Sequence, residues 1–332
     1  MVIIEEIIEV NKVVCLSPEI IWQGNTVLVD REVVFEGAIA LVDLFNGLLL
    51  IQTDQVTSHI IQLDSRAEFE VDGGGTLISD SHVLLGKWNS NFSERTLFGW
   101  DFRKGAEVWT SNSYFGSPVV YGEMLFGHLK AHVFRIGPNT GKPIWSLDVS
   151  RFGSEIVNGK TSPISILDYI GVSGGNLFVR LGSKIIIGIC LEKGVIGFEY
   201  KLDSDILVLD NLQIDDDNGS IFSIGPMNFF EIAISNMKSE LISLSDDLVG
   251  LSVDATRMGS RIGALVSFWQ GSSSSQFGVF DKSTMKVKAT GAIGNEVVDP
   301  IGVQDVKCDR GRLYVLGFNS VLYIFSWNSD RC

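Results

Sequence analysis

The chain has 332 residues, of which 45 % are hydrophobic, and this composition excludes an intrinsically disordered protein, which lacks apolar residues for a core. The 26 basic and 40 acidic residues give a net charge of −14, which argues against a nucleic-acid partner because phosphate binding needs clustered Lys and Arg. The 35 glycines, set among β-branched and aromatic runs, predict many short strands joined by tight turns.

The N-terminal residues 1–10 (MVIIEEIIEV) form an apolar run that contains acidic residues. A secretory signal needs a basic start and an uninterrupted apolar segment, and a membrane span needs about 18 apolar residues in a row. The four cysteines, Cys15, Cys190, Cys308 and Cys332, have neither paired nor metal-binding spacing. We therefore expect a cytoplasmic protein with free thiols, no membrane span, and no metal or other cofactor.

Seven segments repeat one pattern of apolar strands and turn residues, at intervals of about 35 to 50 residues. They are residues 47–71, 82–109, 123–145, 175–200, 219–244, 261–287 and 311–327. No amphipathic helix of convincing length interrupts them. This period predicts an all-β protein, a β-propeller of seven blades with four antiparallel strands each, in a single domain over residues 1–332.

The last segment stops before an outer strand, whereas residues 1–10 have no strand beside them. We expect the N-terminal strand to complete the last blade and close the ring, which would remove unpaired sheet edges. Residues 33–42 (VVFEGAIALV) can hold further strands, so the blade count stays open by one.

A short motif marks the turn before the outer strand. Asp101, Gly105 and Trp109 carry it in full, and Gly141 and Trp145 repeat the Gly–Trp spacing in the next segment. The Asp can cap the turn, the Gly can adopt positive φ, and the Trp is expected to pack between neighbouring sheets. Two further segments keep the motif in part: Cys190, Gly194 and Phe198, and Asp281, Met285 and Ala289.

The motif resembles the pyrroloquinoline-quinone-type repeat of β-propellers, which carries an Asp, a Thr-Gly turn and a Trp. Residues 138–145 (PNTGKPIW) and 100–109 (WDFRKGAEVW) match it. The resemblance implies a fold and no activity. The exported quinone-dependent dehydrogenases of this type have a vicinal disulfide and a calcium site, and this chain has no adjacent cysteines. A similar propeller, an outer-membrane assembly lipoprotein, acts as a protein-binding scaffold but needs a lipobox cysteine, and no signal precedes Cys15 in residues 11–19 (NKVVCLSPE).

Catalytic signatures are weak. His128 and His132 could share a metal if they lay on a helix, but their segment predicts a hairpin. No G-x-S-x-G motif is present, and a Ser/His/Asp triad remains open. We expect no catalytic residues and no enzyme.

Two long loops and an acidic stretch are the candidates for partner binding. Residues 87–95 and 268–276 exceed a tight turn and each place a Trp at a strand end. The acidic stretch, residues 201–220, can form a negative patch that faces a basic partner. Its residues 215–219 (DDDNG) lack the spacing and the distal Glu of a calcium loop. The alternative is that the tryptophans pack between blades and the acids lie in solvated loops. The predicted contact residues are Trp88, Asn91, Phe92, Arg95, Trp269, Gln270, Asp215, Asp216, Asp217, Asp246 and Asp247.

These features favour a non-catalytic propeller that binds another protein. The negative charge would steer a basic partner, so the sharper hypothesis is a cytoplasmic inhibitor or immunity-type protein that neutralises a basic toxin or enzyme and is monomeric alone. Two alternatives stay open: an enzyme or carbohydrate-like small-ligand binder that uses the central channel, and a scaffold subunit of a larger complex.

Overall fold

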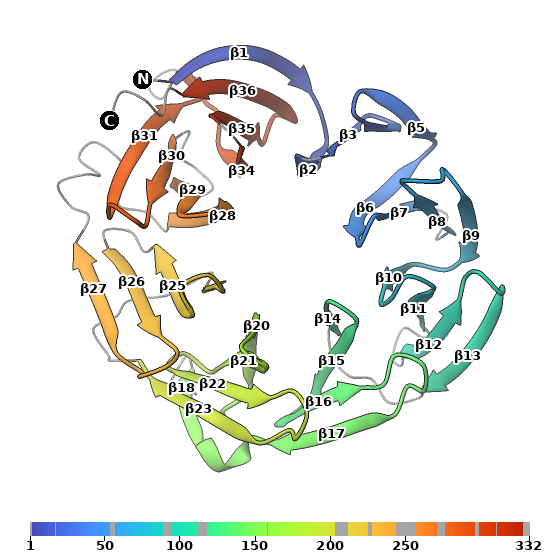
Figure 1. The fold of residues 1–332 in the computed structure, drawn as a ribbon, viewed down its shortest axis with the longest axis vertical. Coiled ribbons are helices and arrows are strands. Elements are labelled where there is room, and N and C mark those ends of the chain that lie inside the picture. Colours follow the sequence, from blue (N-terminus) through green and yellow to red (C-terminus); the bar gives the residue numbers. More distant parts are fainter. Residues whose placement is uncertain are drawn as a thin grey trace. The chain divides into compact units, whose positions relative to one another are not determined.

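The computed structural model describes residues 2–16, 18–53, 57–88, 95–111, 118–157, 159–202, 212–224, 228–243, 256–270, 276–295, 299–309 and 311–327. Within these residues the strands form eight four-stranded antiparallel sheets, the blades, and two separate two-stranded hairpins (Figure 1). The chain divides into two compact units, and each unit holds four of the blades.

Unit 1 consists of Met1–Glu36 and Asp205–Cys332. Its first blade is β2 (Lys12–Leu16), β3 (Glu19–Gln23), β4 (Thr26–Val29) and β5 (Glu32–Glu36). The next two are β24 (Gln213–Asp215), β25 (Ser220–Ile224), β26 (Asn228–Ala233) and β27 (Ser239–Ser243), then β28 (Thr256–Ile262), β29 (Leu265–Gln270), β30 (Gln276–Asp281) and β31 (Lys286–Ala292). The last contains β34 (Val303–Asp309), β35 (Arg312–Gly317), β36 (Val321–Trp327) and β1 (Val2–Glu9), and a small hairpin, β32 (Gly294–Asn295) and β33 (Asp299–Pro300), precedes it.

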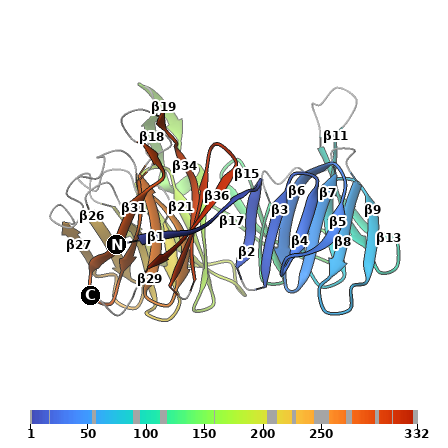
Figure 2. The same ribbon diagram turned by 90° about the horizontal axis from the view of Figure 1, so that it is seen from above.

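Unit 2 spans Gly37–Ser204. Its blades are β6 (Ile39–Phe45), β7 (Leu48–Thr53), β8 (Thr57–Gln62) and β9 (Glu68–Asp72); β10 (Gly75–Leu77), β11 (His82–Trp88), β12 (Arg95–Asp101) and β13 (Ala106–Ser111); β14 (Val119–Tyr121), β15 (Met124–Leu129), β16 (His132–Ile136) and β17 (Pro143–Asp148); and β20 (Ile166–Ser173), β21 (Asn176–Leu181), β22 (Ile185–Cys190) and β23 (Ile196–Lys201). A 3-10 turn (Ser150–Phe152) and a hairpin of β18 (Ser154–Val157) and β19 (Lys160–Pro163) lie between the last two blades in sequence, and Figure 2 shows this hairpin standing clear of the blades.

The all-β propeller fold agrees with the sequence, but the prediction of seven blades is wrong, because the structure has eight. The extra blade is β2–β5, built from strands of four or five residues. Its outer hairpin turns on Asp30 and Arg31, which both have positive φ, and so it carries no Gly–Trp motif. Because its strands are short and its turn contains no glycine, the Gly–Trp motif does not predict this blade.

The N-terminal strand completes the last blade. β1 pairs antiparallel with β36 from Val2, opposite Trp327, to Glu9, opposite Val321. It therefore takes the outer position in a sheet whose other three strands come from the opposite end of the chain (Figure 1).

Seven of the blades described are simple meanders, and in the last one β34, β35 and β36 follow one another while β1 joins from the other end of the chain. The connections within a blade therefore fall on two opposite edges, at the two ends of its strands. The turns from first to second strand and from third to fourth strand lie on one edge, which we call the turn edge. The turns from second to third strand, and the passages to the next blade, lie on the other, the loop edge. This alternation follows from the antiparallel order of the strands.

Aromatic side chains connect neighbouring blades near the turn edge, as the motif predicts. Trp109 on β13 donates its Nε1 hydrogen to Pro138 O of the next blade at 2.6 Å, and Trp145 on β17 donates to Leu191 O at 2.7 Å. Gly141, with φ +64°, lies directly under the Trp109 ring, where a Cβ would overlap the indole. The motif is therefore a blade-to-blade contact.

The core lies mainly between blades. One cluster combines Phe126 and Trp145 of one blade with Leu177 and Val179 of the next, and all four side chains are buried. Burial of such apolar surface is the main stabilising contribution to a sheet stack. In the described part of the chain, no helix has the length and apolar character needed to cross a membrane.

Candidate functional site

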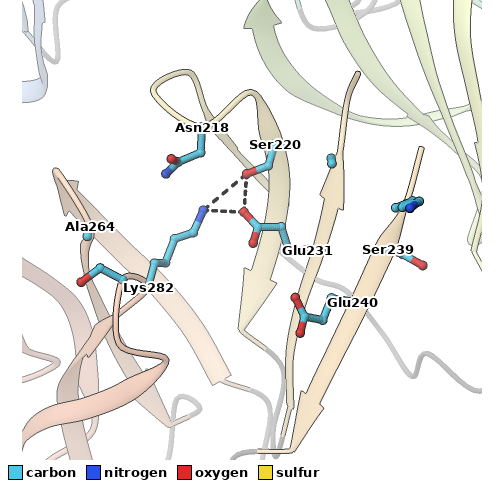
Figure 3. Close-up of a pocket in the computed structure, with 10 residues that line it drawn as sticks. Asn218, Ser220, Glu231, Ser239, Glu240, Ala264 and Lys282 are labelled. Atoms are coloured by element: carbon cyan, nitrogen blue, oxygen red, sulfur yellow. Dashed lines mark hydrogen bonds and ion pairs between the residues drawn. The ribbon is translucent and has the colours of Figure 1, made fainter. Parts of the chain in front are cut away.

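A cavity of about 620 Å³ opens between two neighbouring blades of unit 1, β24–β27 and β28–β31 (Figure 3). Every lining residue belongs to a turn of the turn edge or to a strand segment beside one. The lining consists of Asn218, Ser220, Glu231, Ala233, Lys238, Ser239, Glu240, Ala264, Lys282 and Ser283. Most of these side chains are polar, and four are charged, so a ligand in the cavity would meet hydrogen-bonding and charged groups.

Asp215, the last residue of β24, lies fully buried beneath the cavity. Its carboxylate accepts hydrogen bonds from Lys282 Nζ at 2.5 Å and from Asn218 Nδ2 at 2.9 Å, and it forms an ion pair with Arg261. Burial alone would raise the pKa of Asp215, but the hydrogen bonds from Lys282, Asn218 and Arg261 outweigh it and hold the pKa well below its usual range. Asp215 is therefore a fixed negative charge at neutral pH.

Lys282 links the two blades. It follows β30 in the turn to β31, and its side chain is 4 % exposed. Its Nζ lies 2.8 Å from Glu231 Oε1 and 3.4 Å from Ser220 Oγ, both on the other blade, and 4.1 Å from the centre of the Phe222 ring. Two carboxylates and an aromatic face compensate the buried ammonium group. The base of the cavity is thus a paired and rigid network.

The proximity of Ser220 and Lys282 resembles a serine nucleophile with a lysine base, but the surrounding charges oppose that chemistry. A lysine base must be neutral to accept the serine proton. Lys282 Nζ is engaged in ion pairs with Asp215 and Glu231, and Ser220 is only 2 % exposed and donates its hydroxyl hydrogen to Glu231. This arrangement holds two blades together rather than activating a nucleophile.

The wall of the cavity carries two carboxylates on adjacent strands. Glu231 on β26 and Glu240 on β27 are direct cross-strand partners, a pairing that like charges disfavour. The hydrogen bonds to Glu231 fall on its Oε1, and the Glu240 side chain is exposed with no ion pair to any described residue. In Figure 3 dashed lines join Lys282 to Ser220 and Glu231, and none joins it to Glu240. Glu240 therefore adds a negative charge to the wall with which no described side chain forms an ion pair.

A second polar cluster surrounds His82, in unit 2. The Nδ1 atom of His82 lies 3.1 Å from Ser79 Oγ and 3.0 Å from Ser81 Oγ, while Nε2 lies 4.0 Å from Asp101. Asp101 accepts instead from Lys104, through its Nζ at 2.8 Å and its backbone N–H at 3.0 Å. The side-chain hydrogen bond from Lys104 is the main reason why the pKa of Asp101 is lowered. Asp101 thus caps its turn, and it is too far from His82 to orient the ring as a triad requires.

His128 and His132 point to opposite faces of their hairpin, because the register pairs His128 with Val133 and His132 with Leu129. His128 Nδ1 contacts the Tyr169 hydroxyl at 3.3 Å, whereas His132 lies against Phe134. Within the described ranges, no three His, Cys, Asp or Glu side chains are placed to hold a metal ion.

The structure separates the predicted contact residues. Trp269, on the loop edge, is 6 % exposed and packs with Phe277 and Val303 in a core cluster, and Asp215 is buried in the ion network, so neither is available as a surface contact. Asp216 and Asp217 are exposed on the turn edge, where Asp217 lies 3.6 Å from Arg261.

The other predicted contact residues are only partly described. For Trp88, Arg95 and Gln270 the structure places the backbone at strand ends on the loop edge and describes no side chain. Asn91, Phe92, Asp246 and Asp247 lie outside the described residues.

The sequence analysis does not identify four residues of the site, because they come from three separate stretches of the chain. They are Lys282, Arg261, Glu231 and Glu240. One signal was present: Glu231 interrupts an apolar run, Phe229 to Ile232, and buried acids need a partner. That partner is 51 residues away in sequence and could not be identified from spacing alone.

Comparison with known proteins shows the fold and no closer kinship. No protein-family model and no curated protein matches the chain. Among solved structures, it is similar to BamB from Moraxella catarrhalis, with a TM-score of 0.62 and 12 % identity over 98 % of this chain and 100 % of that one. It is also similar to Sqt1 from Saccharomyces cerevisiae (0.58, 9 %, covering 91 % and 90 %) and to the β-propeller domain of Cps50 (Swd1) from Myceliophteria thermophila (0.52, 12 %, covering 88 % and 97 %). The chain has a β-propeller fold, with eight blades in the residues that the structure describes.

Proposed function

We propose that this protein is a non-catalytic propeller that binds a basic protein partner at the turn edge of unit 1. The observation that carries the proposal is the cavity wall, where Glu240 presents negative charge in a preformed hollow, and Asp216 is exposed in the turn that supplies the lining residue Asn218. Complementary charge accelerates association and selects the partner. The net charge of −14 acts in the same direction at longer range.

More specifically, we propose that the protein is a cytoplasmic inhibitor or immunity-type protein that neutralises a basic toxin or enzyme. We propose that it is a monomer when no partner is bound. We also assign the blades to the pyrroloquinoline-quinone-type repeat, supported by the Asp101, Gly105 and Trp109 motif and by the contact of Trp109 with the next blade. The quinone itself has no part in this proposal.

A small polar ligand is the second candidate, because a cavity of about 620 Å³ with polar lining falls in the usual size range of small-molecule sites. Thermal-shift screening with sugars distinguishes the two. A sugar that raises the melting temperature and competes with the protein partner favours the small ligand.

Affinity capture from a lysate of the native host tests the protein-binding role. The wash uses moderate salt, since high salt screens surface charge. We expect the tagged wild-type chain to retain one stoichiometric basic protein and the double variant Asp216→Lys/Glu240→Lys to lose it. The matched control is Asp64→Lys/Glu192→Lys, which reverses two exposed acids on turns of unit 2. Capture of no stoichiometric protein, or equal capture by both variants, contradicts the proposal.

A further inference from the structure

We infer that the cavity between β24–β27 and β28–β31 receives an arginine side chain, with Glu240 as the carboxylate that binds it. The inference deepens the proposed function, because it names the group through which a basic partner would dock. It rests on the charges, acceptors and rigidity of the lining residues, which are independent of any partner.

The pairing of the carboxylates favours a cation beside Glu240. Below the cavity, Lys282 pairs with Asp215 and Glu231, and Arg261 pairs with Asp215. Glu240 forms no ion pair with a described residue, although Lys238 also lines the cavity, and it lies directly opposite Glu231 in the strand register. A cation placed between these two carboxylates would relieve their repulsion and pair with Glu240.

The acceptors favour a guanidinium group over an ammonium group. A guanidinium carries five N–H donors in a planar fork and binds carboxylates in a bidentate manner. The hydrogen bonds to Glu231 use only Oε1, so Oε2 and the Glu240 carboxylate can accept from such a fork. The side chains of Ser239 and Ser283, also in the lining, add hydroxyl acceptors.

The site is rigid before anything binds. Lys282 is held by three groups on the facing blade and cannot swing out to neutralise Glu240 without breaking its bonds to Asp215 and Glu231. Fixed acceptors reduce the ordering cost of binding. Lys238, which is exposed at the start of the wall, also lines the cavity, and its positive charge opposes a cationic ligand.

The test is an NMR titration of the full chain with N-acetyl-arginine amide, and in parallel with the neutral isostere N-acetyl-citrulline amide. We expect saturable shifts at residues 216–219 and 239–240 with the arginine compound and none with citrulline. Glu240→Gln should weaken binding about tenfold, the usual scale for losing one charge-assisted hydrogen-bonded pair. Lys238→Gln should tighten it, and Glu192→Gln, an exposed acid on a turn of unit 2, should leave it unchanged.

Equal binding of arginine and citrulline compounds, absence of saturable shifts, or unchanged affinity in a folded Glu240→Gln variant overturns the inference. A thermal melt of each variant establishes that it is folded. Failure here is distinguishable from failure of the proposed function. A captured partner that binds the Glu240→Gln variant as tightly as wild type supports the protein-binding role and contradicts the arginine site. Binding of the arginine compound without any captured partner supports the arginine site and contradicts the protein-binding role.

Discussion

Trp109 on β13 packs its indole ring over Gly141, a residue of the neighbouring blade, and donates its Nε1 hydrogen to Pro138 O in the same turn. The pair explains the Gly–Trp spacing that repeats in the sequence. Two constraints favour glycine at position 141: its φ is +64°, and a Cβ there would overlap the space that the Trp109 ring occupies.

Gly141→Ala should therefore destabilise the protein by more than backbone strain alone. A left-handed backbone costs a non-glycine residue about 1 to 2 kcal/mol, and overpacking against Trp109 adds about 1 to 3 kcal/mol. Gly122→Ala is the matched control, because Gly122 has φ +57° and no neighbour near a Cβ. Urea unfolding of both variants measures the difference. Equal losses would show that the ring contact contributes nothing.

Asp215→Asn should lower the free energy of unfolding by about 3 kcal/mol or more at neutral pH, because it leaves Lys282 and Arg261 with one carboxylate fewer in a buried network. Asp216→Asn, one residue along and exposed, should change it by less than about 0.5 kcal/mol. Chemical denaturation gives both values. If the two variants behave alike, the buried network does not stabilise the blade pair.

The contribution of Asp215 should also depend on pH in the acid range. Its pKa in the folded state is depressed below the usual 3.8, so the stabilisation is present above that value and is lost as the pH falls towards the depressed pKa. The stability gap between wild type and Asp215→Asn should be constant from neutral pH down to about 5 and should shrink below about 4. A gap that shrinks already near neutral pH would contradict this assignment.

His128 should make the protein less stable as the pH falls below its usual pKa of 6.5. Burial lowers the pKa of His128 in the folded state, so the unfolded chain binds the proton more readily in that range. His128→Gln should flatten the stability profile between about pH 5 and 7, where an ordinary histidine titrates. Melting temperatures of wild type and His128→Gln, measured across that pH range, give the two stability profiles to be compared.

The sequence predicts the propeller because the strands and several turns carry local signals, but the turn chemistry varies more than a motif search allows. Gly105, Gly141 and Gly194 have φ between +63° and +65° in the turn before the outer strand. Met237 and Met285 adopt nearly the same backbone, at +58° and +54°. At Met237 a turn hydrogen bond from its N–H to Ala233 O accompanies this conformation, which a non-glycine residue does not prefer.

The site could be predicted much less well than the fold. The sequence does indicate the acidic turn at Asp215 to Asp217, but not that its first member is buried and the other two exposed. That division depends on Lys282, which lies 67 residues later and arrives from the next blade. The sequence leaves two interpretations of Trp269 open, a surface contact and packing between blades, and the structure packs it against Phe277 of its own blade and Val303 of the next.

The most direct test of a basic partner at this site is the affinity of the captured protein for the purified chain, measured by calorimetry at low and moderate salt. We predict that Asp216→Lys/Glu240→Lys weakens binding by at least tenfold, about 1.4 kcal/mol, and reduces its salt dependence. The control Asp64→Lys/Glu192→Lys should bind within about twofold of wild type. Equal weakening by both variants would mean that net charge, and not the cavity, attracts the partner, and no weakening by either would contradict electrostatic binding altogether.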